Sequence, residues 1–214
     1  MLFQDRQDAA KQLLWLLEEF RNKEVVVLAI PRGGVPIGCI LAKELNASLD
    51  LLLSKKIGAL GNPEFAIGAV GPDFIWVESQ LDIDPSYIEK ETNRIRAELA
   101  RRQTIFNKYK TPTPLKDKIV IITDDGIATG RTILAALPTI RKQQPDSIIV
   151  ATPVCSPQAR TLLEPQVEQL ISCADPDPFI GVGRFYQNFE EVTDQQVLLL
   201  LDSFYQTHTH VAKN

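Results

Sequence analysis

One stretch decides the fold: residues 119–132, which read IVIITDDGIATGRT. Its first five residues are all β-branched and four of them are apolar, a composition that is typical of a strand buried in a parallel sheet. The run ends on two acids, Asp124 and Asp125, and a small loop leads into a helix that we predict over residues 131–143. The sequence therefore predicts a strand, an acidic pair, a tight loop and a helix start in immediate succession.

The loop Gly126-Ile-Ala-Thr-Gly130 is predicted to bind a phosphate. Such a loop directs free backbone N–H groups and the positive end of a helix dipole at one point, where the hydroxyls of Thr129 and Thr132 can add donors. The two preceding carboxylates can accept hydrogen bonds from sugar hydroxyls or hold water around a divalent cation. A phosphorylated sugar fits both halves. An ordinary turn with a capping Asp is the alternative, but capping accounts for only one acid and one hydroxyl.

This stretch resembles the signature of type I phosphoribosyltransferases, in which four hydrophobic residues precede two acids, a small loop and Thr-Gly-x-Thr. The resemblance implies binding of 5-phosphoribosyl-1-pyrophosphate (PRPP), with the acids on the ribose hydroxyls and the loop around the 5′-phosphate. It also implies Mg²⁺, held by PRPP oxygens and, through water, by the acids. The candidate substrate-binding residues of the stretch are Asp124, Asp125, Gly126, Ile127, Ala128, Thr129, Gly130, Arg131 and Thr132.

A second strand-loop-helix unit offers another anion site. The strand predicted over residues 24–30 is followed by Pro31-Arg32-Gly33-Gly34 and a helix over residues 35–45. The two glycines allow close approach of a ligand to the backbone, and Arg32 can form a bidentate clamp on an anion. Taken alone, a plain turn explains this loop equally well. It resembles the pyrophosphate loop of the same family, and the resemblance implies a cis peptide between Pro31 and Arg32.

A strand predicted over residues 48–54 precedes Lys55 and Lys56. The family often has Arg-Lys here, so the resemblance implies that Lys56 reaches the pyrophosphate while Lys55 replaces the Arg; a solvated basic pair is the alternative. Residues 57–65 are rich in Gly and include a Pro, which is typical of an irregular, mobile loop. They coincide with the catalytic loop that closes over PRPP in the family, so we expect a flexible lid that excludes water.

The remaining chain alternates strands and helices, which predicts an α/β fold: a doubly wound, mostly parallel sheet flanked by helices, with ligands at the carboxyl ends of the strands. A hairpin is predicted over residues 66–77. We expect one phosphoribosyltransferase-like domain over residues 1–214, with its core at about 24–175 and a small hood at about 176–190. Family hoods stack on the acceptor base, and the aromatics available here, each of which surface packing explains equally well, are Phe179, Phe185, Tyr186 and Phe189.

Composition excludes several other classes. The chain has 214 residues and a formal net charge of −4, which argues against a general nucleic-acid surface. No apolar run approaches the ~20 residues of a membrane span, and the first residues lack the pattern of a signal peptide, so we expect a cytoplasmic protein. The three cysteines, Cys39, Cys155 and Cys173, lack the spacing of metal ligands.

The resemblance implies an enzyme of nucleotide salvage that transfers the 5-phosphoribosyl group of PRPP to a nitrogen acceptor, expected to be a nucleobase, and releases pyrophosphate. Its catalytic residues would be Arg32, Lys56, Asp124 and Asp125. Enzymes that use 6-oxopurines usually carry an acid where this chain has Ala128, so such an acceptor is in doubt. A catalytically silent PRPP-binding regulator is the main alternative, and a PRPP-synthesising enzyme is a weaker one. Homodimers are common in the family.

Overall fold

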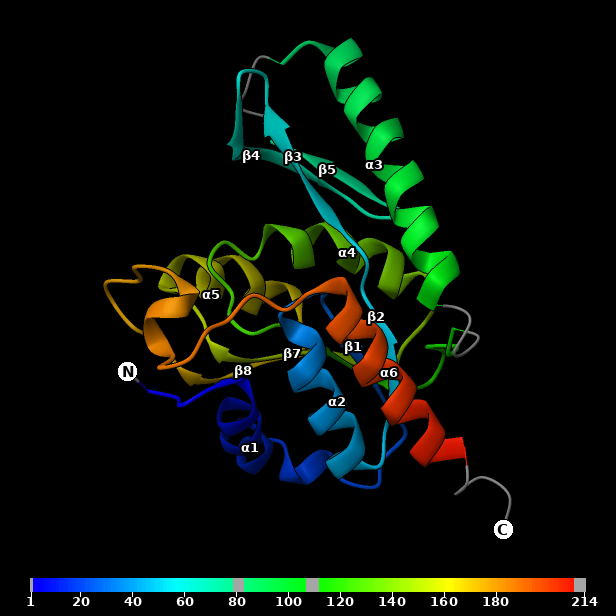
Figure 1. Cartoon of the computed structure of the whole chain (residues 1–214), viewed down its shortest axis with the longest axis vertical. Helices are drawn as coiled ribbons and strands as arrows, with labels where there is room; N and C mark the ends of the chain where they lie inside the picture. The colour runs from blue at the N-terminus through cyan, green and yellow to red at the C-terminus, as the bar shows by residue number, and fades with distance from the viewer. Residues whose placement is uncertain (1, 79–82, 107–111, 210–214) are drawn as a thin grey trace.

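A five-stranded parallel sheet forms the centre of the computed structural model, which describes residues 2–78, 83–106 and 112–209. The sheet order is β2-β1-β6-β7-β8 (Figure 1). The predicted α/β fold with a mostly parallel, helix-flanked sheet is therefore confirmed. In that order the strands span Ser48–Leu51, Val25–Ala29, Ile119–Thr123, Ser147–Val154 and Gln169–Ala174.

The direction of winding reverses between β1 and β6, the neighbours at the middle of the sheet. The chain leaves β1 toward β2 on one side and returns as β6 on the other, with Ala29 and Thr123 as the last pair in register. Ligands of doubly wound folds bind in the crevice at such a reversal, outside the carboxyl ends of the strands. Both predicted anion loops follow these two strands, so the topology brings them to one point.

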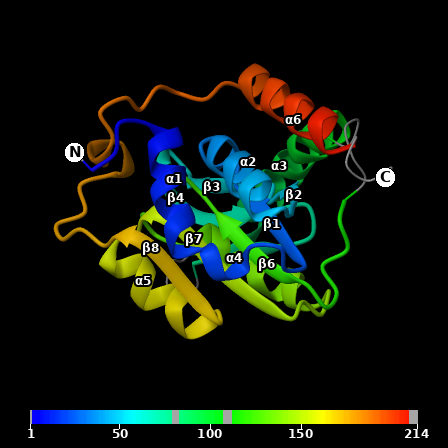
Figure 2. The same cartoon turned by 90° about the horizontal axis from the view of Figure 1, so that it is seen from below.

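Helices cover both faces of the sheet. Successive side chains of a strand point to opposite faces, and because they are apolar on both faces, each face is buried by helices. Val25, Val27 and Ala29 face the side of α1 (Arg6–Leu16), α2 (Gly34–Leu45) and α6 (Asp194–Thr209). Val26, Leu28 and Ile30 face α4 (Arg131–Arg141) and α5 (Pro157–Leu163). Figure 2 shows the two helical layers with the sheet between them. The described residues also form short 3₁₀ turns at Glu18–Phe20, Glu164–Gln166 and Val182–Phe185.

A second, antiparallel sheet stands above the carboxyl edge of the first (Figure 1). It contains β3 (Lys55–Ala59), β4 (Asn62–Val70) and β5 (Ile75–Val77), and the long helix α3 (Pro85–Phe106) packs on it. Their shared core contains Ile57, Ile67, Val70, Ile95 and Leu99. The hairpin predicted over residues 66–77 is therefore confirmed.

The prediction of an irregular loop over residues 57–65 is wrong. These residues form most of the hairpin between β3 and β4, which turns at Leu60 and Gly61. Gly61 has φ +79°, a conformation that glycine adopts at no steric cost, so it forms the turn. The register between β3 and β4 shifts on both sides of Gly58. Whether this hairpin closes over a ligand stays a prediction.

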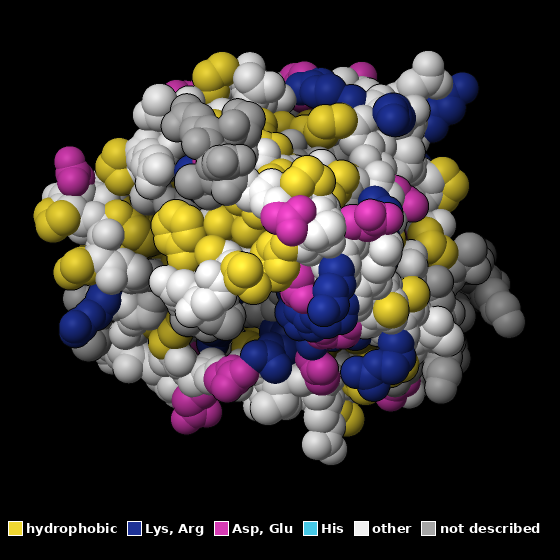
Figure 3. All heavy atoms as spheres, turned by 90° about the horizontal axis from the view of Figure 1, so that it is seen from above, with side chains coloured by type: hydrophobic (Ala, Val, Ile, Leu, Met, Phe, Trp, Pro, Cys, Tyr) yellow, Lys and Arg dark blue, Asp and Glu magenta, His cyan; other side chains and the backbone are white. Residues whose placement is uncertain are grey.

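The second sheet carries exposed apolar side chains. Figure 3 shows hydrophobic side chains gathered on this side of the molecule. Phe65 and Ile75 are large exposed residues of its strands, and the exposed Leu60 lies in the turn between β3 and β4. Ala59, Ile67, Ile83 and Tyr87 line a hollow beside Leu60 and Phe65. No helix in the described part of the chain is both long and apolar enough to span a bilayer.

The packing of α2 on β1 gives a test of the fold. A Cβ atom on Gly38 would lie 2.6 Å from the Cβ of Ala29, so Gly38→Ala should lower the unfolding free energy by about 1–3 kcal/mol in urea titrations, although alanine favours helices. In an Ala29→Gly background the same change should cost little, because the opposing methyl group is gone. An equal cost in both backgrounds would contradict the close approach.

Candidate functional site

The two predicted anion loops pack directly against each other at the carboxyl edge of the sheet. A Cβ atom on Gly33 would lie 2.0 Å from Oδ2 of Asp125, and one on Gly34 would lie 2.8 Å from the carbonyl oxygen of Thr123 and 2.9 Å from Cα of Asp124. Only glycine fits at either position. The peptide bond between Pro31 and Arg32 is cis, as the resemblance predicts.

Two helices begin at this point with open N-termini. The N-cap residues of α2 and α4 are Gly33 and Gly130, and neither helix has a side-chain cap. By contrast, the Asp5 carboxylate caps α1 and the Ser156 hydroxyl caps α5. In α4 the first N–H groups remain available to an anion, and the helix dipole adds to the attraction. In α2 the amides of Gly34 and Val35 donate to the carbonyl oxygens of Ile30 and Arg32 (3.0 and 3.2 Å), while in the part of the chain that the structure describes the Gly33 amide donates to no backbone carbonyl. The open helices are the two that flank the acidic pair.

The loop before α4 is fixed in shape and open to solvent. Its carbonyl at Ala128 accepts a hydrogen bond from the Ser156 hydroxyl (2.6 Å), and the amide of Ile127 donates to Val154 (2.9 Å). Ala128 and Thr129 are exposed, and within residues 2–78, 83–106 and 112–209 the amides of Ala128, Thr129 and Gly130 donate to no backbone carbonyl. These three amides are therefore available to donate to an anion.

The acidic pair is largely shielded from solvent. Burial and the adjacent charge of Asp125 raise the pKa of Asp124 well above its ordinary value, against a hydrogen bond from the Asp125 amide (2.8 Å). Burial also raises the pKa of Asp125, while a neighbouring guanidinium acts in the opposite direction. A divalent cation or sugar hydroxyls at this position would favour the ionised forms.

That guanidinium belongs to Arg6, which sequence reasoning missed. Its Nε and Nη2 atoms lie 2.9 and 2.7 Å from Oδ2 of Asp125. The hydroxyl of Tyr186 donates to the carbonyl oxygen of the same aspartate (2.6 Å). Arg6 lies near the start of the chain and Tyr186 near its end, and neither belongs to a motif. No local sequence pattern could therefore have predicted their contacts with Asp125.

The predicted hood residues have different environments. Tyr186 is 2 % exposed and packs on Phe3 with ring centroids 5.2 Å apart, so its ring is not available to stack on a base. This corrects its assignment as a candidate base-stacking residue. Phe179 and Phe185 contact each other, at 5.4 Å, and Phe189 is 36 % exposed.

Arg32 is bound by acids from the end of the hood. Its Nη2 contacts the carboxylate of Glu191, and its Nη1 lies 4.0 Å from Asp194. The Glu191 side chain is 75 % exposed, whereas that of Arg32 is 37 % exposed. A solvated carboxylate therefore holds the arginine that the sequence assigns to an anion.

The two lysines of β3 point in opposite directions. Lys55 donates to Glu98 of α3 (2.6 Å), and this hydrogen bond lowers the pKa of that carboxyl. Lys56 is paired in the ladder with Ala69, which packs into the core beneath α4. Since directly opposed residues share a face, Lys56 lies on the α4 side and Lys55 on the α3 side. The predicted site residue Arg131 also points to the second sheet, pairing with Glu78 at 2.9 Å.

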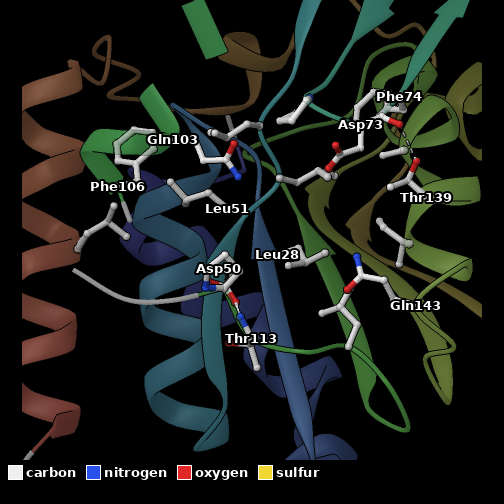
Figure 4. A pocket seen from close by; sticks show the side chains of 18 of the residues that line it. Leu28, Asp50, Leu51, Asp73, Phe74, Gln103, Phe106, Thr113, Thr139 and Gln143 are labelled. Atoms are coloured by element: carbon white, nitrogen blue, oxygen red, sulfur yellow. Dashed lines mark hydrogen bonds between the residues drawn. The ribbon is translucent and has the colours of Figure 1, made fainter. Parts of the chain in front are cut away.

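A cavity of about 210 Å³ lies away from these loops, between β2, α3, α4 and α6 (Figure 4). Leu28, Asp50 and Phe74 line it, and Thr139 of α4 and Gln143, which follows that helix, face it. None of the predicted site residues lines this cavity, so the candidate site lies apart from it.

Comparison with known proteins identifies the family. The model of the phosphoribosyl transferase domain family matches residues 4–183, which is most of the chain. The chain belongs to the phosphoribosyl transferase family. The match ends before Tyr186 and Glu191, so the contacts that these two residues make with the site lie outside the matched region.

Relatives of this phosphoribosyl transferase domain agree with that assignment. The chain is 35% identical over 206 residues to a Mycobacterium tuberculosis (strain H37Rv) protein named "Putative phosphoribosyl transferase Rv0571c". The match covers 94% of this chain and 46% of that protein, so the chain spans about half the length of the curated relatives it matches.

Solved structures support the same fold. The structure of TT1426 from Thermus thermophilus is 35% identical, covers 95% of this chain and 99% of its own, and superposes with a TM-score of 0.79. A hypothetical protein from Neisseria gonorrhoeae with bound ppGpp is 15% identical with a TM-score of 0.54, over 94% of this chain and 95% of that one, and shows likeness of fold only.

The raised pKa of Asp124 makes a prediction for stability. A carboxyl whose pKa is higher in the folded than in the unfolded protein destabilises the fold increasingly as pH rises from the unfolded value toward the folded one. Asp124→Asn retains an acceptor for the Asp125 amide and should raise the unfolding free energy at pH 7. The gain should shrink toward pH 4, as followed by urea unfolding.

The exposed Asp146 provides the matched control, because Asp146→Asn removes one carboxylate at the surface. A gain for Asp124→Asn that does not vary with pH, or an equal gain in the control, would contradict the electrostatic explanation.

Proposed function

We propose that this protein is a phosphoribosyltransferase that uses PRPP and Mg²⁺ to transfer the 5-phosphoribosyl group to a nitrogen acceptor, releasing pyrophosphate. The observation that carries the proposal is the meeting of two uncapped helix N-termini on either side of one acidic pair. PRPP has the same order of groups: a phosphate, a sugar with vicinal hydroxyls, and a pyrophosphate. Membership of the family supports the same substrate.

Each part of PRPP has a proposed binding group. The 5′-phosphate would bind the amides of residues 126–132 and the hydroxyls of Thr129 and Thr132, whereas the ribose hydroxyls would donate to Asp124 and Asp125. The pyrophosphate would bind Arg32, the Gly33 amide and Lys56, while Gly34, whose amide donates to Ile30, would allow its close approach. The position of Lys56 on the α4 side of the second sheet supports its role, and the ion pair of Lys55 with Glu98 makes Lys55 the weaker candidate.

Mg²⁺ fits this site as an ion that arrives with the substrate. Within the described residues, no group of three or more His, Cys, Asp or Glu side chains is placed to hold a metal. Mg²⁺ typically keeps several waters and is held by one or two carboxylates together with substrate phosphates. Asp124 and Asp125 would contact it through water, and when bound it neutralises charge on the pyrophosphate.

The proposed chemistry is displacement at the anomeric carbon of the ribose. The bond from this carbon to pyrophosphate breaks ahead of attack, the nitrogen acceptor forms the new bond on the opposite face, and the acceptor loses a proton. The chain would contribute by positioning the ribose and by stabilising the charge of the leaving group through Arg32 and the Gly33 amide.

We propose a nucleobase as the acceptor, in a reaction of nucleotide salvage, and the loop restricts the choice. Ala128 is exposed and has no group that handles a proton, so it cannot assist protonation or deprotonation of a 6-oxopurine ring nitrogen. We also propose a homodimer, which the exposed apolar residues Leu60, Phe65 and Ile75 of the second sheet support.

The function is tested by incubating the protein with PRPP, Mg²⁺ and a panel of nucleobases and amines while pyrophosphate is measured. One nucleobase or amine should lead to release of pyrophosphate. Asp125→Asn should lower the turnover with it by about 10²-fold or more, because the carboxylate that accepts the ribose hydroxyl is lost. Asp146→Asn is the control and should retain activity.

Binding of PRPP without pyrophosphate release for any acceptor would favour a regulatory protein. Failure to bind PRPP in titration calorimetry would overturn the proposal itself.

Competition between Glu191 and the pyrophosphate gives a second prediction. Glu191→Gln should tighten binding of pyrophosphate by up to about fivefold, because an exposed ion pair worth at most about 1 kcal/mol no longer opposes the ligand. Titration calorimetry measures the change. Glu164→Gln breaks a comparable exposed pair with Arg160 away from the site and should have no effect. Unchanged or weaker binding by Glu191→Gln would refute the competition.

A further inference from the structure

Arg6 makes a shielded ion pair with Asp125. Its Nε and Nη2 atoms both contact Oδ2, at 2.9 and 2.7 Å, and the two side chains are only 11 % and 13 % exposed. Ion pairs of this kind are screened by salt much less than surface pairs. The contact joins the first residue of α1 to the loop after β6, two parts of the chain 119 positions apart.

The guanidinium of Arg6 is fixed from two further directions. Its Nη1 donates to the carbonyl oxygen of Glu190 (2.8 Å), and its central carbon lies 4.0 Å from the ring centroid of Phe189. The segment before it is bound to the hood, since the amides of Leu2 and Phe3 donate to Phe185 at 2.8 and 3.0 Å. Its location is therefore determined by the fold rather than by Asp125 alone.

The charged and titratable groups that face Asp125 come from each element packed against it. Asp124 is its neighbour in the loop, Arg6 approaches from α1, and the Tyr186 hydroxyl approaches from the hood. The loop of Gly33 contributes backbone only at the point of contact. Arg6 is thus the cation that offsets both the burial of Asp125 and the repulsion from Asp124.

We propose that Arg6 is a positioning residue of the PRPP site, whose guanidinium fixes the orientation of the Asp125 carboxylate so that it can accept a ribose hydroxyl. The inference rests on the proposed function, because it assigns Asp125 to the ribose. Arg6 acts through Asp125 and contacts its Oδ2 atom with both Nε and Nη2. A carboxylate that is already held in one orientation need not be ordered when the sugar binds.

The test compares Arg6→Met, which keeps the aliphatic length and removes the charge, with Arg6→Lys, which keeps the charge. Two readouts are needed. The first is PRPP affinity in the presence of Mg²⁺ by calorimetry, and the second is the affinity for pyrophosphate without Mg²⁺, a ligand that has no ribose. Arg21→Met, which breaks an exposed pair with Glu18, is the matched control.

In Arg6→Met, PRPP binding should weaken about tenfold, because the Asp125 carboxylate is no longer held in place for the ribose. Pyrophosphate binding should stay within about twofold of that of the unaltered protein, because this ligand has no ribose to contact Asp125. Arg6→Lys should restore most of the PRPP affinity. A residue that only stabilised the hood would lower the affinity for both ligands.

The outcomes separate the two proposals. If the unaltered protein fails to bind PRPP, the proposed function fails, whatever the pyrophosphate titration shows. If it binds and Arg6→Met leaves PRPP affinity unchanged, or weakens PRPP and pyrophosphate by the same factor, the role of Arg6 is refuted. Tighter binding by Arg6→Met would also refute it, because Arg6 would then obstruct the site.

Discussion

The contact between two loops at the winding reversal of the sheet is the constraint on which the site depends. Gly33 lies so close to the Asp125 carboxylate that any side chain at position 33 would occupy the same space. This contact sets the distance between the open ends of α2 and α4, with the acidic pair between them. Parallel pairing of β1 with β6 fixes the approach, and the glycines permit it. Two candidate anion sites and two candidate hydroxyl acceptors therefore occupy one edge.

Both ends of the chain close on this contact and adjust its charge. Arg6 offsets the buried negative charge of Asp125, Tyr186 holds the backbone of the same residue, and Glu191 occupies Arg32. Asp125 thus has a hydrogen-bond donor within the chain, and Arg32 has an anion within the chain, where a bound substrate would supply such groups. The two ion pairs differ in exposure. The Glu191 carboxylate is solvated, so a ligand can displace it from Arg32 easily, whereas the ion pair of Arg6 with Asp125 is shielded and is expected to remain when a ligand binds.

Local patterns predicted much of this architecture. The β-branched run at 119–123, the acids and glycines after it and the second glycine loop predicted the two loops that meet at this edge, and the resemblance predicted the cis bond before Arg32. Composition failed at residues 57–65, because Gly and Pro are frequent in loops but the pairing of β3 with β4 is decided by tertiary packing on α3. Arg6 and Tyr186 could not be predicted, since their roles arise from contacts between distant segments rather than from spacing.

The most direct measurement is a ¹H–¹⁵N NMR titration of the protein with PRPP and Mg²⁺. The account predicts that the largest saturable shifts fall together on the amides of Gly33 and Gly34 and of residues 128–132, the open ends of α2 and α4. Shifts on only one of the two loops, or shifts centred on the cavity beside Asp50 and Phe74, would contradict a single donor bound across both.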